Sequence, residues 1–356
     1  MRIVFYGEAT ASLALYLDGL APDLAAQCTL MPPRRMAADF PLLARAGMVV
    51  FVRGFEQVWR SGLLAALDRA GVPCAWFTDD DLTALRHEQP GFGFYSSHRV
   101  QAFAERMTAL IGTTPGLCAR LAAFHANVLH WPCTLNEAAL DGISPSGQER
   151  PTVVAFTGGA FRVQGLRDYV VPALNVIQRH ELCVANGPAA AIPGTHAIPF
   201  QPVFARFLLA WRDVGPHILV HPPGKTRNLA YKSPGILLCA LYLGAAPVVA
   251  SEPAFKGIGA DQGLTRADSV AAWRDAFTAL AAAPARERAL ARLLVHARKA
   301  WPPDGPRATI SALLALAAPG GDAAKARYDA ALAMRWAPLA GFMWRERVRR
   351  FASHNQ

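Results

Sequence analysis

The sequence has few charged side chains, and it contains no pair of cysteines at Cys-x-x-Cys spacing. Charged residues make up 17% of the 356 residues and hydrophobic residues 53%, which excludes an intrinsically disordered chain. The six cysteines lie far apart, mostly within apolar runs: Cys28, Cys74, Cys118, Cys133, Cys183 and Cys239. This spacing excludes a zinc framework and favours the reduced, packed thiols of a cytosolic protein over disulfide bonds.

Long apolar segments are missing as well. The longest, 235–250, contains Gly244 and Pro247 and falls short of the ~20 residues that a transmembrane helix needs. Near the N-terminus the apolar run after Arg2 is broken by Glu8, so it is too short for the apolar core of a signal peptide. We expect a soluble cytoplasmic protein, in peripheral contact with the inner membrane face at most.

Two common nucleotide-binding motifs are absent. The sequence lacks the G-x-x-x-x-G-K-[ST] spacing, and no G-x-G-x-x-G follows the first expected strand. ATP hydrolysis and NAD binding therefore lose support. Zinc-finger and RNP-type signatures are also missing, so the formal net charge of +10 points to phosphorylated small molecules or acidic lipid rather than nucleic acid.

Short β-rich runs alternate with helical patterns along the whole chain. Most of the expected strands are continuous apolar runs, which is typical of parallel strands buried on both faces: 2–7, 27–31, 48–53, 74–79, 127–132, 152–158, 181–186, 217–222 and 247–250. Helices are expected over 57–71, 97–112, 165–179 and 203–213, and in a segment that begins with Ser233 as N-cap and ends at Gly244. This alternation predicts doubly wound α/β domains.

The length predicts two domains, because a single core rarely grows to this size. The polar, turn-rich stretch 137–150 is the expected linker. We therefore predict one Rossmann-like domain over 1–147 and a second over 148–333. The remaining 334–356 carries five arginines with interleaved aromatics. We expect it to be a helical tail packed on the first domain, with contact to an anionic membrane as the alternative.

A cluster of polar and cationic residues follows the expected strand ends of the second domain. Lys232 and Ser233 stand directly before an apolar helix, where backbone N–H groups and the helix dipole favour an anion. Together the cluster predicts a diphosphate pocket, formed by Gly158, Gly159, Arg162, His221, Lys225, Arg227, Asn228, Tyr231, Lys232 and Ser233. An ordinary capped helix with a solvated lysine is the alternative.

The first domain offers acidic and hydroxyl candidates. Asp80 and Asp81 follow an expected strand and are candidates for orienting or deprotonating an acceptor, although an N-cap and turn is an equally good interpretation. Glu8, Thr10 and Ser12 lie on the first loop and either bind the acceptor or face solvent.

The order of these motifs resembles GT-B glycosyltransferases, in particular bacterial members of the family 4-like group. The matching segments are His221–Pro223, Asn228, Lys232–Ser233, Gly244, 247–251 and 261–264, together with 71–82 and 152–161. The resemblance implies two Rossmann-like domains that face a central cleft. It also implies metal-independent transfer of a sugar from a nucleotide diphosphate sugar to a glycan, lipid-linked or protein acceptor, as in polysaccharide biosynthesis. Lys232 would then stabilise the leaving diphosphate.

One position departs from the resemblance. In most relatives the helix after the Lys-Ser pair carries a glutamate that holds the donor ribose, and the matching residue here is Cys239. A thiol cannot replace that bidentate acceptor. A non-catalytic nucleotide-sugar binding protein is therefore the alternative hypothesis to a glycosyltransferase. A sugar-nucleotide epimerase is a third, less favoured hypothesis.

Overall fold

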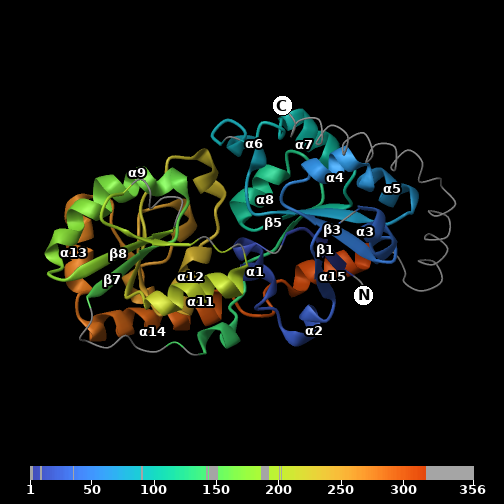
Figure 1. Cartoon of the computed structure of the whole chain (residues 1–356). Helices are drawn as coiled ribbons and strands as arrows, with labels where there is room; N and C mark the ends of the chain where they lie inside the picture. The colour runs from blue at the N-terminus through green and yellow to red at the C-terminus, as the bar shows by residue number, and fades with distance from the viewer. Residues whose placement is uncertain are drawn as a thin grey trace. The chain divides into compact units, whose positions relative to one another are not determined.

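The computed structural model forms two compact units, shown in Figure 1. It describes residues 3–8, 10–34, 36–89, 91–141, 143, 151–185, 192–199, 201 and 203–317. Unit 1 comprises Met1–Glu8, Pro22–Trp131 and Pro306–Gln356, and unit 2 comprises Ala9–Ala21 and Pro132–Gly305. Each unit is built on one six-stranded sheet.

The sheet of unit 1 has the order β2-β1-β3-β4-β5-β6, and all neighbouring strands are parallel. Its strands are β1 (Ile3–Tyr6), β2 (Cys28–Met31), β3 (Met48–Val52), β4 (Cys74–Thr78), β5 (Ala109–Gly112) and β6 (Val128–His130). Its helices are α2 (Pro22–Ala25), α3 (Met36–Leu43), α4 (Glu56–Ser61), α5 (Leu63–Arg69), α6 (Leu82–Leu85), α7 (Ser97–Ala104), α8 (Pro115–Leu121) and α15 (Arg307–Leu316). Strands β3 and β4 are buried at every position, as the continuous apolar runs predicted.

The sheet of unit 2 has the order β12-β11-β10-β7-β8-β9, again with all neighbours parallel. Its strands are β7 (Thr152–Phe156), β8 (His180–Ala185), β9 (His196–Ile198), β10 (Ile218–His221), β11 (Ala246–Val249) and β12 (Thr265–Arg266). Its α-helices are α1 (Ala11–Leu17), α9 (Val163–Gly165), α11 (Phe204–Val214), α12 (Gly235–Leu243), α13 (Val270–Ala279) and α14 (Ala283–Ala300). Helix α9 lies on one side of the sheet and α11, α12 and α14 on the other (Figure 1).

Shorter helical turns connect these elements. They are η1 (Glu137–Leu140), η2 (Ala160–Arg162), η3 (Leu166–Val170), η4 (Val171–Val176), η5 (Arg227–Tyr231), η6 (Pro253–Phe255) and η7 (Ala260–Gln262). On one face of the unit 2 sheet, Leu166, Val170, Trp273 and Phe277 form a buried core with the strand side chains. The η3, η4 and α13 segments are thereby held against that face.

Two of the helices predicted from the sequence are wrong in extent. The helix expected over 57–71 is divided into α4 and α5 by Gly62, whose φ of 73° is left-handed. The helix expected over 97–112 ends at Ala104, and Ala109–Gly112 form β5 instead. Strand β5 lies between β4 and β6, so its backbone forms hydrogen bonds with a strand on each side, and a local helical pattern does not reveal these distant partners.

The helix expected over 165–179 is also different. It is a succession of short turns, in which η3 is a π-helical turn and η4 is a 3-10 helix. Pro172 lies in the first turn of η4. Proline lacks the backbone N–H that donates along an α-helix and its ring crowds the preceding turn, so Pro172 disfavours a regular α-helix through this segment.

The two units differ from the expected division at 147/148. Helix α1 packs against α11 and α12, and the Leu15 carbonyl accepts a hydrogen bond of 2.9 Å from the Thr134 amide, so Ala9–Ala21 belongs to unit 2. Helix α15 packs against β3, and Thr309 Oγ1 donates to the His130 carbonyl, so α15 belongs to unit 1. The predicted tail 334–356 lies outside the described residues.

All six cysteines are free thiols, as the sequence predicted. Four of them are buried: Cys74, Cys133, Cys183 and Cys239. In the part of the chain that the structure describes, no helix has both the length and the apolar content needed to cross a bilayer.

Two left-handed glycines provide a test of packing in unit 2. Gly263 has a φ of 80°, and an added Cβ would lie 2.0 Å from the Ala289 carbonyl oxygen of α14. Gly257 has a φ of 83°, with nothing within 4 Å of an added Cβ. We expect Gly257→Ala to cost about 1–2 kcal/mol of backbone strain and Gly263→Ala to cost more, because it also displaces α14. Thermal unfolding measures both, and equal midpoints would contradict this packing.

Candidate functional site

Three loops of unit 2 leave the same edge of its sheet. Strand β10 lies between β7 and β11, and all three are parallel, so their carboxyl ends share one edge. The loops that follow them are 157–162, 222–228 and 250–256. The turns η5 and η6 pack against each other beside this edge. Ligands of such sheets bind at the carboxyl ends of the strands, which is where the predicted phosphate residues lie.

A buried ion pair connects these loops. Arg162 is only 2% exposed, and it makes a bidentate contact with Glu252, with Nη1 2.5 Å from Oε1 and Nη2 2.8 Å from Oε2. Nη1 also donates to the Pro222 carbonyl at 2.6 Å. The guanidinium thus joins the loops that follow β7, β10 and β11. Glu252 was missed by the sequence analysis, although it is an acidic residue directly after a buried strand in otherwise cationic surroundings.

The last residue of β10, His221, lies next to this pair. Its Nε2 is 3.8 Å from Glu252 Oε2, and its ring packs edge-on against Phe255. Its Nδ1 is buried and makes no hydrogen bond to any described residue. Burial first, and then the positive charges of Arg162 and Lys232, hold the pKa of His221 well below its usual value, so the ring is neutral at pH 7.

Lys232 and Ser233 occupy the approach to α12. Lys232 follows η5, and Ser233 Oγ shares a hydrogen bond of 2.7 Å with the hydroxyl of Tyr16. Helix α12 begins at Gly235 with Pro234 as N-cap, and no side chain caps it. The prediction that Ser233 caps this helix is therefore wrong, because its hydroxyl is bonded to Tyr16 instead. The predicted end at Gly244, with a φ of 65°, is confirmed.

The other predicted side chains of the loop after β10 differ in exposure. Lys225 and Arg227 are exposed, Tyr231 is half-buried, and Asn228 is 1% exposed. The Lys225 amide donates to the Phe161 carbonyl at 3.2 Å, which joins this loop to the loop after β7. Two cations are thus presented to solvent from a loop whose backbone is held in place.

The glycines allow a close approach of the loops. An added Cβ at Gly158 would lie 2.6 Å from the Phe156 ring, and one at Gly165 would lie 2.2 Å from the Pro223 carbonyl oxygen. At Gly159 an added Cβ would meet the Phe161 ring at 3.1 Å, which is a less severe contact. Gly158 and Gly165 therefore serve packing at the sheet edge.

Cys239, the position at which the resemblance expects a glutamate, lies inside α12. It is 8% exposed, and burial, followed by the neighbouring Cys133, raises the pKa of its thiol to about 12. The thiol is therefore neutral and provides no charged acceptor for a sugar hydroxyl.

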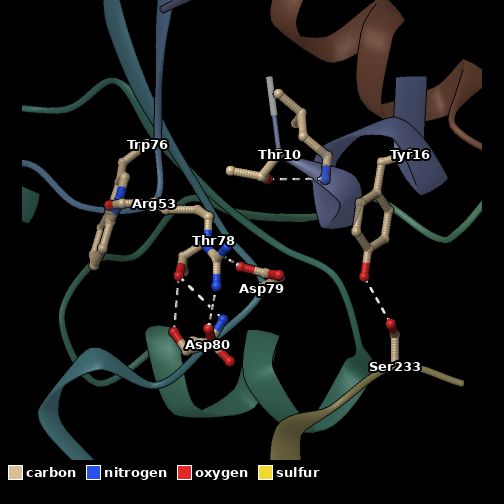
Figure 2. Close-up of polar contacts among 9 residues, drawn as sticks. Thr10, Tyr16, Arg53, Trp76, Thr78, Asp79, Asp80 and Ser233 are labelled. Atoms are coloured by element: carbon tan, nitrogen blue, oxygen red, sulfur yellow. Dashed lines mark hydrogen bonds and ion pairs between the residues drawn. The ribbon is translucent and has the colours of Figure 1, made fainter. Parts of the chain in front are cut away.

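In unit 1 the predicted acidic residues are buried and paired. Asp79–Asp81 follow β4, and Arg53 reaches the first two, with Nε 2.8 Å from Asp79 Oδ1 and Nη2 2.7 Å from Asp80 Oδ2 (Figure 2). Arg53 itself has a left-handed φ of 59°, and Trp76 Nε1 donates to its carbonyl at 2.7 Å. This strained residue directly follows β3, and the sequence analysis did not select it.

Asp81 is the N-cap of α6. Its Oδ1 accepts hydrogen bonds from the amides of Thr83 at 2.9 Å and Ala84 at 3.3 Å, and its Oδ2 lies 2.9 Å from Arg120 Nε. The N-cap interpretation is confirmed for this residue. Since both of its oxygens have partners, this geometry favours a structural role over that of a general base.

The candidates on the first loop do not all belong to one unit. Glu8 is exposed and belongs to unit 1. Thr10 and Ser12 belong to unit 2, where the Thr10 hydroxyl caps α1 by accepting from the Leu13 amide at 3.3 Å (Figure 2). Among the described residues, no three His, Cys, Asp or Glu side chains are grouped so that they could hold a metal ion.

Comparisons with known proteins identify the fold. HepE from Anabaena, solved in complex with UDP and glucose, has 10% identity and a TM-score of 0.52, with 89% of this chain and 100% of that chain covered. MurG from Acinetobacter baumannii has 12% identity and a TM-score of 0.40 over 88% and 99% of the two chains. No protein-family model and no curated protein sequence matches. The two Rossmann-like units have the GT-B fold, as predicted.

The buried ion pair predicts a large difference between two Glu→Gln substitutions. Glu252→Gln leaves Arg162 buried without its counter-charge, and we expect it to lower the free energy of unfolding by about 3–5 kcal/mol. Glu137→Gln removes an exposed pair with Arg298 and should change the unfolding midpoint little. Thermal or urea unfolding measures the contrast. Similar losses in the two variants would show that the Arg162 pair is not structural.

The lowered pKa of His221 predicts that the folded protein loses stability in acid. The unfolded chain protonates this histidine near its usual pKa of about 6.5, whereas the folded protein disfavours protonation beside Arg162 and Lys232. The contribution of His221 to the free energy of unfolding is therefore fully present above pH ~6.5. As the pH decreases below ~6.5, this contribution is lost by up to about 1.4 kcal/mol per pH unit. Unfolding midpoints from pH 8 to 5 should show a shallower acid slope in His221→Gln. The pKa values of His130 and His296 are also lowered, so part of the slope remains. An unchanged slope would contradict the prediction.

Proposed function

We propose that this chain is a glycosyltransferase of the family 4-like group, which moves a sugar from a nucleotide diphosphate sugar to a glycan, lipid-linked or protein acceptor. The observation that carries the proposal is the placement of Lys232 and Ser233 at the carboxyl edge of the unit 2 sheet, directly before the uncapped first turn of α12. The GT-B fold shared with HepE, whose structure contains UDP and glucose, supports this choice of donor.

The charges at this edge suit a diphosphate. The first-turn N–H groups of α12 carry a partial positive charge, and Lys232 adds a full one. Lys225 and Arg227 are exposed on the adjacent loop, where they can reach the nucleotide. When the bond between the sugar carbon and the diphosphate breaks, its electron pair passes to the diphosphate. Lys232 and the helix dipole stabilise this growing charge, and we propose that they take the place of a metal ion.

The buried groups beside the diphosphate residues have a supporting role in this proposal. Arg162 is committed to Glu252, so we assign it to holding the three loops together rather than to direct contact with phosphate. In unit 1, Asp80 and Asp81 remain the predicted acceptor-side carboxylates, with Glu8, Thr10 and Ser12. Location in the cytoplasm, contact of 334–356 with an anionic membrane, and a part in polysaccharide biosynthesis belong to the same proposal.

One observation favours a second candidate function, nucleotide-sugar binding without transfer. The neutral, buried thiol of Cys239 cannot hold a ribose as a carboxylate does. A protein of this kind would bind the donor but release no nucleoside diphosphate in the presence of any acceptor.

The test compares nucleotide binding by wild type, Lys232→Ala and Lys299→Ala. Lys299 is an exposed lysine in the last turn of α14, so its replacement makes the same change of charge elsewhere. With UDP, GDP, dTDP or their sugar conjugates at 100 times Kd, wild type and Lys299→Ala should gain about 2.7 kcal/mol of stability, and Lys232→Ala should lose most of this gain. For a transferase, Lys232→Ala should also lower kcat by about 100-fold or more. Binding of no nucleotide by wild type would refute the proposed function.

A further inference from the structure

A buried tyrosine contacts the serine of the proposed diphosphate site. The Tyr16 hydroxyl and Ser233 Oγ are 2.7 Å apart, as Figure 2 shows. Tyr16 is 2% exposed, whereas Ser233 is half-buried. The contact joins residues 217 positions apart in the chain, so it is a purely tertiary interaction.

Helix α1 holds Tyr16 in a fixed position. The Leu15 carbonyl accepts from the Thr134 amide at 2.9 Å, and the Ala21 amide donates to the Pro303 carbonyl at 2.9 Å. An added Cβ at Gly235 would lie 2.8 Å from Leu15 Cδ1, so α1 packs directly against the start of α12. The phenol therefore projects from a well-anchored helix toward a residue at a loop end.

The chemistry of the two hydroxyls gives this contact a direction. A phenol, with a pKa of about 10, is a stronger hydrogen-bond donor than an aliphatic alcohol. When Tyr16 donates to Ser233 Oγ, the serine proton remains available to an external oxygen acceptor. The same bond keeps the serine from capping α12, whose N-cap makes no side-chain hydrogen bond.

We propose that Tyr16 is a positioning residue for the proposed function. It orients Ser233 so that the serine hydroxyl donates to a phosphate oxygen of the donor, and it leaves the first turn of α12 open to the same group. This inference rests on the proposed function, because it requires that Ser233 binds the diphosphate.

The experiment measures the Kd of the best-binding nucleoside diphosphate by calorimetry in wild type, Tyr16→Phe and Tyr6→Phe. Tyr6→Phe is the matched control, because Tyr6 is also buried and donates to Asp39 Oδ2 at 2.9 Å in unit 1. Loss of one hydrogen bond predicts a Kd roughly 3- to 10-fold higher in Tyr16→Phe and unchanged in Tyr6→Phe. Thermal unfolding without nucleotide reports the structural cost of each substitution separately.

A double-mutant cycle with Ser233→Ala shows whether Tyr16 acts through Ser233. We expect Tyr16→Phe to have no further effect on Kd once Ser233 is alanine. Three outcomes would overturn the inference: an unchanged Kd in Tyr16→Phe, an equal loss of affinity in Tyr6→Phe, or additive losses of affinity in the cycle. In each of these cases, nucleotide binding by wild type would still support the proposed diphosphate site. If wild type binds none of UDP, GDP, dTDP and their sugar conjugates, the proposed function fails and the role of Tyr16 fails with it.

Discussion

The ion pair between Arg162 and Glu252 determines the arrangement of the candidate site. Both side chains are buried, and the pair bridges the loops that follow β7 and β11, while Arg162 also binds the carbonyl of Pro222 after β10. Two buried charges without each other would cost several kcal/mol each, so the loops cannot separate without a large penalty. His221 lies beside the pair, and burial, followed by the positive charges of Arg162 and Lys232, holds its pKa well below the usual value, so that the ring is neutral. The adjacent loop, which carries Lys225 and Arg227, is bonded to the loop after β7 through the Pro222 carbonyl and the Lys225 amide.

Charge is balanced differently in unit 1. There, Arg53 and Arg120 form ion pairs with Asp79–Asp81. Arg53 has a left-handed backbone, and the surrounding contacts must offset the free-energy cost of this strained conformation. Three consecutive carboxylates after a buried strand can indicate a site that acts as an acid or base or binds a metal. Their described ion-pair partners are Arg53 and Arg120, which hold these carboxylates at the end of the sheet. In unit 2, by contrast, Lys225 and Arg227 are exposed and Lys232 is half-buried.

The approach to α12 shows how a tertiary contact changes the meaning of a local motif. Serine followed by proline before an apolar helix is a good N-cap signal, and by itself it predicts a closed helix end. Tyr16, contributed by a distant helix, takes the serine hydroxyl, and the first turn of α12 remains uncapped. An uncapped helix beside lysine is a better anion site than a capped one, because its N–H groups have no side-chain partner.

The sequence by itself determined the class of fold. Continuous apolar runs such as those of β3 and β4 can be buried only between two layers, and their alternation with helices leaves a parallel sheet as the solution. It also predicted which loops follow β7, β10 and β11, and the carboxyl ends of parallel strands are where ligands of such sheets bind. Only the tertiary structure decided which charged side chains are exposed and which are buried in ion pairs. It also decided that α1 belongs to unit 2 and α15 to unit 1. Pairings such as Arg162 with Glu252 and Tyr16 with Ser233 join residues far apart in the chain, and no local pattern encodes contacts that packing alone creates.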